Sequence, residues 1–258
     1  MTAKTRRDPP TAATRAAQEL DLGGGSSISY LPGHFAADQA DEWFKALDSS
    51  LPWERPEIFV RGRRSLQPRE TFYIADPGLK PLKYSGHAPA YHIWDDFPVL
   101  QAIRDAVCEA VPGYAFNSCL INRYADGDSS VAWHSDAEKL FGIAPTIASL
   151  SLGTSRDFLV RRKVRSKRAS AEVDSAHGTK RTKREKVSAV DVISSRGETQ
   201  DEKELGEETS KFSFYLGNGD VLLMRGNMQR DWEHAVPKRK AVKGTRLSLT
   251  FRTVLEPS

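Results

Sequence analysis

Three side chains in this chain have the types and the spacing of a divalent-metal site: His134, Asp136 and the distant His234. In a strand, residues i and i+2 point to the same side, so His134 and Asp136 can grip one ion while Ser135 faces away. Two imidazoles and one carboxylate on one face of a metal leave other positions open, which is typical of non-haem Fe(II) oxygenases. The alternative is a chance triplet whose histidines are ordinary surface or core residues.

A second set of candidates lies near the C-terminus, where residues 246–252 alternate strictly between polar and apolar types. The polar face of this expected strand carries Arg246, Ser248, Thr250 and Arg252. Because a guanidinium binds carboxylates through two parallel hydrogen bonds, two arginines on this face could take the two ends of a short dicarboxylic acid. Asn122 and Tyr124, again two residues apart, could add hydrogen bonds from a neighbouring strand. The alternative is a sandwich strand with a solvated polar face.

The elements that must position these groups are short strands that follow two helices. Apolar periodicity predicts helices over 38–47 and 98–111. Short apolar runs rich in β-formers predict strands over 116–124, 146–152, 158–162, 220–225 and 246–254. Several short strands separated by Gly, Pro and Asp turns indicate an antiparallel barrel or sandwich, in a mainly β member of the α+β class.

Two polar segments are expected to lie outside this core. Residues 1–25 are basic, rich in Pro, Ala and Thr, and end in three glycines, so we expect a disordered leader before a domain over 26–258. Residues 164–211 contain no aromatic residue, with a basic first half and an acidic second half. We expect a disordered insertion between two strands, and the alternative is a spacer without a specific task. Its basic run, 180–186, resembles a nuclear import signal, so nucleus and cytoplasm both stay open.

Composition narrows the class of protein. The chain has 258 residues, a net charge of +4 and 39% hydrophobic residues, which suits one sizeable domain and allows a polyanionic partner. Two cysteines can form neither a disulfide scaffold nor a Cys-rich zinc site, so a reducing compartment is expected. The first residues contain no apolar segment of a secretory signal, and no apolar run reaches membrane-spanning length. We expect a soluble intracellular monomer.

Eight short stretches between about residue 30 and the C-terminus carry a family resemblance. They are Pro68-Arg69, Tyr84-Ser85, Phe116-Asn117-Ser118, Asn122-Arg123-Tyr124, Trp133-His134-Ser135-Asp136, Ile147-Ala148-Ser149-Leu150-Ser151-Leu152-Gly153, Asp231-Trp232-Glu233-His234 and Leu249-Thr250-Phe251-Arg252. In these stretches the sequence resembles the AlkB family of nucleic-acid dealkylating dioxygenases, especially the branch of human AlkB homologues two and three. The resemblance implies a double-stranded β-helix, or jelly roll, with N-terminal helices packed on one sheet.

The resemblance also implies residue roles. It implies that iron is bound by His134, Asp136 and His234. It implies that 2-oxoglutarate is bound by Asn122, Tyr124, Arg246, Thr250 and Arg252. It implies that the substrate is contacted by Trp53, Arg61, Arg69, Leu82, Tyr84 and Glu138, with the flipped base stacked between Tyr84 and His134. For Trp53 and Leu82 the alternative is plain core packing. The chain departs from the branch at Ala137, where a second acidic residue is common, at Leu82, and in the 164–211 insertion.

The implied reaction is oxidative demethylation of 1-methyladenine- and 3-methylcytosine-type bases in DNA, with RNA left open. It consumes O2 and 2-oxoglutarate and releases formaldehyde, succinate and CO2. The alternatives are an oxygenase of the same fold that acts on RNA modification or on protein, and a nucleic-acid-binding protein without turnover. The segment 60–62 aligns with the hairpin by which the duplex-preferring branch invades the base stack. Because Arg61 stands at its tip in place of an aromatic wedge, single strands are the expected substrate.

Overall fold

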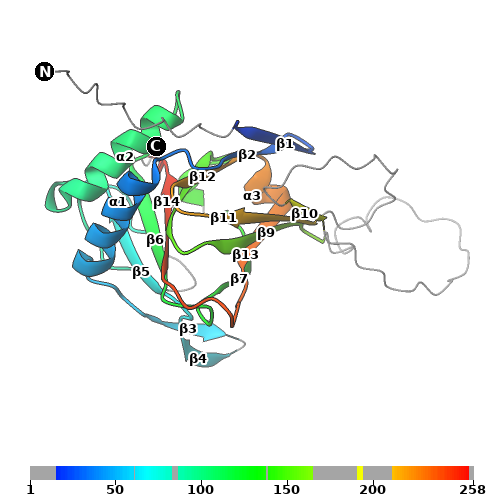
Figure 1. Cartoon of the computed structure of the whole chain (residues 1–258). Helices are drawn as coiled ribbons and strands as arrows, with labels where there is room; N and C mark the ends of the chain where they lie inside the picture. Colours follow the sequence, from blue (N-terminus) through cyan, green and yellow to red (C-terminus); the bar gives the residue numbers. More distant parts are fainter. Residues whose placement is uncertain are drawn as a thin grey trace, which may run out of the picture.

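The computed structural model describes residues 16–60, 62–82, 87–137, 139–164, 191–193 and 211–255. Strands dominate this part of the chain and helices are few, so the expectation of a mainly β protein is confirmed (Figure 1). None of the helices there combines the length and apolarity that crossing a membrane requires.

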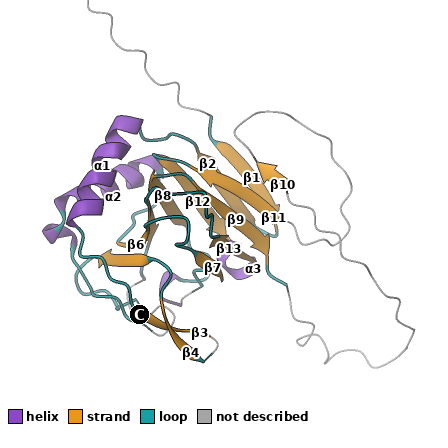
Figure 2. Ribbon diagram, turned by 60° about the horizontal axis from the view of Figure 1, so that its bottom comes forward, coloured by secondary structure: helices purple, strands orange, loops and turns teal. Residues whose placement is uncertain are grey.

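Two large sheets account for most of the strands in the described residues. The first sheet contains, in spatial order, β1 (Gln18–Gly23), β2 (Ser26–Leu31), β12 (Asp220–Gly226), β8 (Ile147–Gly153), β14 (Arg246–Arg252), β6 (Ser118–Tyr124) and β5 (Glu70–Ala75). The second contains β10 (Asp191–Ile193), β11 (Lys211–Leu216), β9 (Arg156–Arg162), β13 (Trp232–Val236) and β7 (Val131–His134). A separate hairpin, β3 (Glu57–Val60) and β4 (Arg63–Leu66), lies apart from both sheets (Figure 2).

The helices are α1 (Ala37–Ser50), α2 (Pro98–Ala110), the short α3 (Met228–Asp231), and the 3-10 turns η1 (Trp94–Asp96) and η2 (Lys139–Phe141). The first two match the helices predicted from apolar periodicity. Leu47 of α1 and Ile103 of α2 are buried in one hydrophobic cluster with Leu249 of β14. One cluster thus contains side chains of both helices and of the first sheet, and Figure 1 draws the two helices beside that sheet.

The alternation predicted for residues 246–252 determines which side chains reach the space between the sheets. Leu247, Leu249 and Phe251 are fully buried in the cluster with α1 and α2. The opposite face of β14 is also buried, with Arg246 1% and Arg252 4% exposed, so the alternative of a solvated polar face is wrong. Apolar residues of both sheets fill the rest of the space between them, among them Ile28, Ile147, Phe158, Val160, Phe214, Leu222 and Val236.

The structure corrects the expected N-terminal leader. Residues 1–15 lie outside the described residues, but β1 pairs antiparallel with β2, so the expectation of disorder is wrong from residue 18 onward. Leu22 is buried between the sheets. The three glycines expected to end the disordered leader lie where this hairpin turns, because Gly23, Gly24 and Gly25 all have positive φ, a conformation that glycine adopts without a steric penalty.

The predicted insertion begins and ends beside adjacent strands, since β9 pairs antiparallel with β11. Most of residues 164–211 lie outside the described residues. At Asp191–Ile193, however, the expectation of an unstructured segment is wrong, because these residues form β10 and pair in parallel with β11. Val192 and Ile193 are β-branched, and β11 offers them a free sheet edge.

Candidate active site

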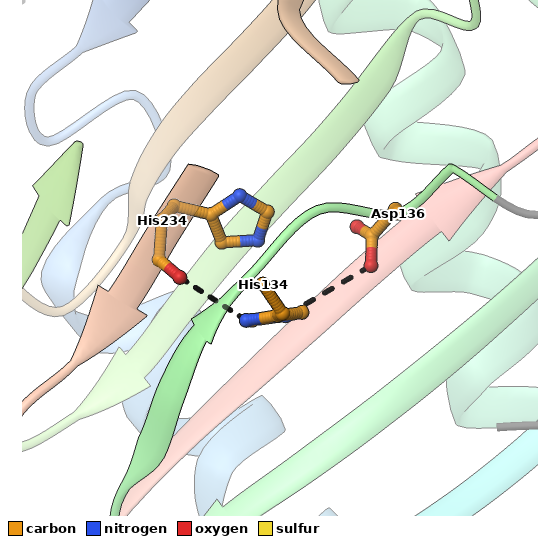
Figure 3. A group of neighbouring side chains, drawn as sticks. All are labelled: His134, Asp136 and His234. Atoms are coloured by element: carbon orange, nitrogen blue, oxygen red, sulfur yellow. Dashed lines mark hydrogen bonds and ion pairs between the residues drawn. The ribbon is translucent and has the colours of Figure 1, made fainter. Parts of the chain in front are cut away.

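Cross-strand register brings the two candidate histidines together. His134 ends β7 and lies directly opposite His234 of β13. Asp136 follows two residues later, beyond the end of the strand. The ligand atoms of His134, Asp136 and His234 all lie within 4.8 Å of one another, and His134 Nε2 is 3.9 Å from Asp136 Oδ1 (Figure 3). A set of two imidazoles and one carboxylate is thus assembled from residues 100 positions apart.

The hydrogen bonds of His134 favour one tautomer. Its Nδ1 lies 2.9 Å from the carbonyl oxygen of Ala132 and 3.1 Å from that of His234. A carbonyl oxygen can only accept, so Nδ1 carries the proton when these contacts are satisfied. Nε2 is then the unprotonated nitrogen, and it lies on the side of Asp136. The ring of His234 is held by a stacked contact with Phe158, at 5.1 Å between ring centroids.

Burial and charge keep these three side chains in the forms that bind cations. Burial lowers the pKa of His234 to about 3, with the neighbouring His134 acting in the same direction, and burial also lowers the pKa of His134. Burial alone raises the pKa of the Asp136 carboxyl, but the charge of Arg252 holds it well below its ordinary value. Neutral imidazoles beside an ionised carboxylate are the protonation states that metal binding requires.

The candidate metal ligands line a cavity between the sheets. Most of the polar residues predicted to bind the co-substrate also line this cavity. The cavity is lined by Arg69, Leu120, Asn122, Tyr124, Val131, His134, Asp136, Ser149, Phe158, Met224, His234, Val236, Ser248, Thr250 and Arg252. Arg252 connects the predicted co-substrate residues to the candidate metal ligands, because its Nη2 donates to Asp136 Oδ2 at 2.8 Å and both side chains are buried.

Arg246 stands at the other end of the polar face of β14. Its guanidinium lies over the ring of Tyr124, 5.4 Å from the centroid, and its Nη2 donates to Ser151 Oγ at 2.8 Å. Within the described residues its Nε and Nη1 have no hydrogen-bond partner. Burial lowers the pKa of Arg246 to about 10, while Tyr124 acts in the opposite direction. A buried cation with unused donors fits one carboxylate of a bound dicarboxylic acid.

The residues therefore fit the groups that the resemblance implies. Two nitrogen ligands and one oxygen ligand suit Fe(II), and three ligands leave positions for a chelating co-substrate and for O2. Arg246 and Arg252 come from opposite ends of one strand face, Asn122 and Thr250 lie between them, and Tyr124 lies opposite Arg246. This arrangement suits 2-oxoglutarate, whose two acidic ends need separate cationic partners.

The predicted substrate residues divide into three groups. Arg69 lines the cavity, and its Nε donates to Asn122 Oδ1 at 2.6 Å. Trp53 and Leu82 do not line it. Trp53 packs beside α1, where its indole N–H donates to the carbonyl oxygen of Asp48. Leu82 is buried in a separate apolar cluster. The packing of both residues matches the alternative of plain core packing. The remaining three, Arg61, Tyr84 and Glu138, lie outside the described residues.

Several side chains at the site were not predicted. Gln229 of α3 is 3% exposed, and its Oε1 accepts the backbone N–H of Asp136 at 2.9 Å. Lys163, at the end of β9, donates to Ser135 Oγ. Phe158 could have been found, because the alternation of residues 156–162 places it on the same face as Val160. Nothing in the local pattern around Gln229 or Lys163 indicates a contact with the metal loop, the Ser135–Asp136 segment that follows β7.

Comparisons with known proteins agree with this geometry. The 2OG-Fe(II) oxygenase superfamily matches residues 27–252. The chain is 42% identical to the DNA oxidative demethylase ALKBH2 of Arabidopsis thaliana, over 96% of this chain and 72% of that protein. It is 30% identical to the human alpha-ketoglutarate-dependent dioxygenase alkB homolog 3, over 90% of this chain and 67% of that protein. Among solved structures, OsALKBH1 is similar with a TM-score of 0.45 and 17% identity, over 91% of this chain and all of that one.

A mainly β protein with this donor set and this superfamily match is a 2OG-Fe(II) oxygenase, which uses Fe(II), 2-oxoglutarate and O2. At the similarities just given, the chain belongs to the AlkB family of these enzymes.

Proposed function

We propose that this enzyme oxidatively removes methyl groups from N-alkylated bases of the 1-methyladenine and 3-methylcytosine type. The proposed substrate is DNA, with RNA as a second substrate and single strands preferred over duplex. One observation carries the proposal. The candidate metal ligands and four of the five predicted co-substrate residues, all but Arg246, line one cavity, in a chain 42% identical to a protein named as a DNA oxidative demethylase.

In this proposal His134, Asp136 and His234 hold iron, and Arg246 and Arg252 bind the two ends of 2-oxoglutarate. Tyr124, Asn122 and Thr250 complete the co-substrate site. When bound, the iron supplies oxidation of a methyl C–H bond with O2, coupled to decarboxylation of 2-oxoglutarate to succinate. The resulting N-hydroxymethyl base loses formaldehyde without a protein nucleophile. The protein contributes ligand geometry, co-substrate orientation and a buried cavity.

The β3–β4 hairpin supports a nucleic-acid substrate. It exposes Phe59 (69%) and Leu66 (53%), and the guanidinium of Arg64 lies 5.7 Å from the centre of the Phe59 ring. Exposed aromatic and cationic side chains together suit unstacked bases and phosphates. Between β3 and β4 the structure describes Gly62, at positive φ, and the proposed tip residue before it is Arg61 rather than an aromatic wedge. Single strands avoid most of the unpairing cost that such a wedge would offset.

Several finer points belong to the same proposal. We propose a jelly roll with α1 and α2 packed on one of its sheets, a monomer, and a location in the nucleus, the cytoplasm or both. Glu138 and Tyr84 are proposed to contact the base, and Ala137 leaves the base preference open. An oxygenase that acts on RNA modification or on protein remains the second candidate, and the exposed hairpin argues for the nucleic acid. Binding without turnover is disfavoured by the complete set of candidate ligands.

The test is the repair of one 1-methyladenine in single-stranded and duplex oligonucleotides of the same sequence, with a methylated peptide as the control substrate. We expect formaldehyde and succinate from the single strand, less from the duplex, and none from the peptide. Faster duplex repair by the native protein would refute the strand preference. A gain in duplex repair by Arg61→Phe supports the position of the tip, and no gain would refute it. Formaldehyde from the peptide alone would overturn the proposed substrate.

A further inference from the structure

The loop that carries Asp136 is not held by the sheet. β7 ends at His134, and the register between β7 and β13 contains only the pairs His234–His134 and Val236–Val131. Asp136 therefore has no strand partner, although its carboxylate must stay in place beside two imidazoles. Arg252 fixes the carboxylate itself, through the 2.8 Å contact with Oδ2. The backbone of the loop needs other partners, because a ligand on a mobile loop binds a metal weakly.

Two side chains supply these partners. The amide oxygen of Gln229 accepts the backbone N–H of Asp136 at 2.9 Å. The ammonium of Lys163 donates to Ser135 Oγ at 2.7 Å and to the backbone oxygen of Gln229 at 2.8 Å. Lys163 also donates its backbone N–H to the carbonyl oxygen of Asp231 at 2.8 Å. The end of β9, the metal loop and α3 are thus tied into one network, and Figure 1 shows α3 beside β9 and β13.

We propose that Lys163 and Gln229 are positioning residues for the metal site, which hold the Ser135–Asp136 backbone so that the Asp136 carboxylate is preorganised for iron. The inference rests on the proposed ligand roles of His134, Asp136 and His234. Neither residue contacts the reacting atoms, so both act through Asp136.

The burial of Gln229 distinguishes this network from an ordinary surface loop. Gln229 is 3% exposed, and its amide nitrogen finds only the weak acceptor Met224 Sδ, at 3.6 Å. A buried amide whose strongest contact is the N–H of a metal-binding residue is costly to keep unless that contact is needed. The ammonium of Lys163 likewise uses two of its three N–H donors for hydrogen bonds to this loop and to α3.

The experiment measures the binding of Co(II) or Mn(II) to the full-length protein by calorimetry, without co-substrate. The test variants are Gln229→Ala, Lys163→Met and Lys163→Arg. Lys211→Met is the matched control, because Lys211 is a cation on the neighbouring strand β11 that lies 5.8 Å from the Trp133 ring and has no hydrogen bond to the loop. We expect the metal dissociation constant to rise about 10- to 100-fold in Gln229→Ala and in Lys163→Met. Lys163→Arg should recover most of the affinity, and Lys211→Met should bind as the native protein does.

A second readout separates positioning from folding. With saturating metal, the concentration of 2-oxoglutarate that gives the half-maximal rate should be unchanged in Lys163→Met, while the metal requirement rises. Native metal affinity in folded Gln229→Ala and Lys163→Met would overturn the proposal. If both variants fail to fold, Ser135→Ala removes a single acceptor from the network. Native metal affinity in that variant would also overturn the proposal. Absence of metal binding in the native protein would overturn the ligand set, and the inference with it.

Discussion

Replacement of each arginine of β14 by lysine should impair a different combination of metal binding and co-substrate binding. Arg252 donates to the metal-ligand candidate Asp136 at 2.8 Å, with the two side chains 5% and 4% exposed. Arg246 contacts Ser151 and Tyr124 and makes no contact with the three candidate metal ligands. Lysine keeps the positive charge but loses the planar fork and part of the reach. Arg252→Lys should therefore damage both the metal and the co-substrate site, whereas Arg246→Lys should damage the co-substrate site alone.

The magnitude follows from the hydrogen bond that is lost. A hydrogen bond to a charged group contributes about 1.5–3 kcal/mol, and this one joins two buried side chains. Because about 1.4 kcal/mol corresponds to a factor of ten, loss of the Arg252–Asp136 contact should weaken metal binding by roughly 10- to 150-fold. Loss of the carboxylate contact in Arg246→Lys should raise the 2-oxoglutarate requirement by a similar factor and leave the metal affinity unchanged.

The assay combines Co(II) titration of each variant with initial rates against 2-oxoglutarate concentration at saturating metal. Affinity for an unmodified oligonucleotide is measured in parallel. If Arg252→Lys leaves metal affinity and co-substrate requirement unchanged but weakens oligonucleotide binding, Arg252 faces a phosphate and the assignment fails. Equal loss of metal affinity in Arg246→Lys would refute the separation of the two roles.

Three further predictions concern the fold around the site. Leu249→Ala, at a fully buried position between the sheet and the helices, should lower the free energy of unfolding by about 2–5 kcal/mol. The control Ile143→Ala, at a 94% exposed position, should change it by no more than about 0.5 kcal/mol. Equal effects of the two substitutions in urea denaturation would contradict the packing. Replacement of residues 165–210 by a short turn should leave a folded enzyme with metal-dependent turnover, because β9 and β11 are antiparallel neighbours, and a folded but inactive deletion variant would show that the segment belongs to the site. Burial raises the pKa of the Cys119 thiol, so in the native protein iodoacetamide should modify the half-buried Cys108 and spare Cys119, and rapid modification of Cys119 detected by peptide mass spectrometry would contradict this.

Sequence reasoning succeeded where local periodicity carries the information. The alternation of residues 246–252 predicted both which side chains pack under the helices and which lie on the opposite face of β14. The strand predicted to carry both His134 and Asp136 ends at His134, so alternation along a strand does not by itself place Asp136. The long helices were also predicted from apolar spacing, with boundaries within a few residues of α1 and α2. These features depend on a period of 2.0 or 3.6 residues, which the sequence displays directly.

It failed where pairing between distant segments decides the structure. Residues 18–25 were expected to be disordered because of their composition, yet β2 pairs with β1 and the glycines make the turn between them. Gln229 and Lys163 reach the metal loop only because α3 and the end of β9 converge on it in three dimensions. No local pattern marks such contacts, because they depend on the tertiary arrangement of three separate segments.

The central claim is that His134, Asp136 and His234 hold the iron with which this enzyme demethylates nucleic acid. Its most direct test follows a single-stranded oligonucleotide with one 1-methyladenine by mass spectrometry, while succinate and formaldehyde are measured in the same reaction. The native protein with Fe(II), 2-oxoglutarate and O2 should restore adenine in step with both products, and folded Asp136→Ala should restore none. Restoration by Asp136→Ala at the native rate, or succinate formation by the native protein without restored adenine on any methylated oligonucleotide, would contradict the claim.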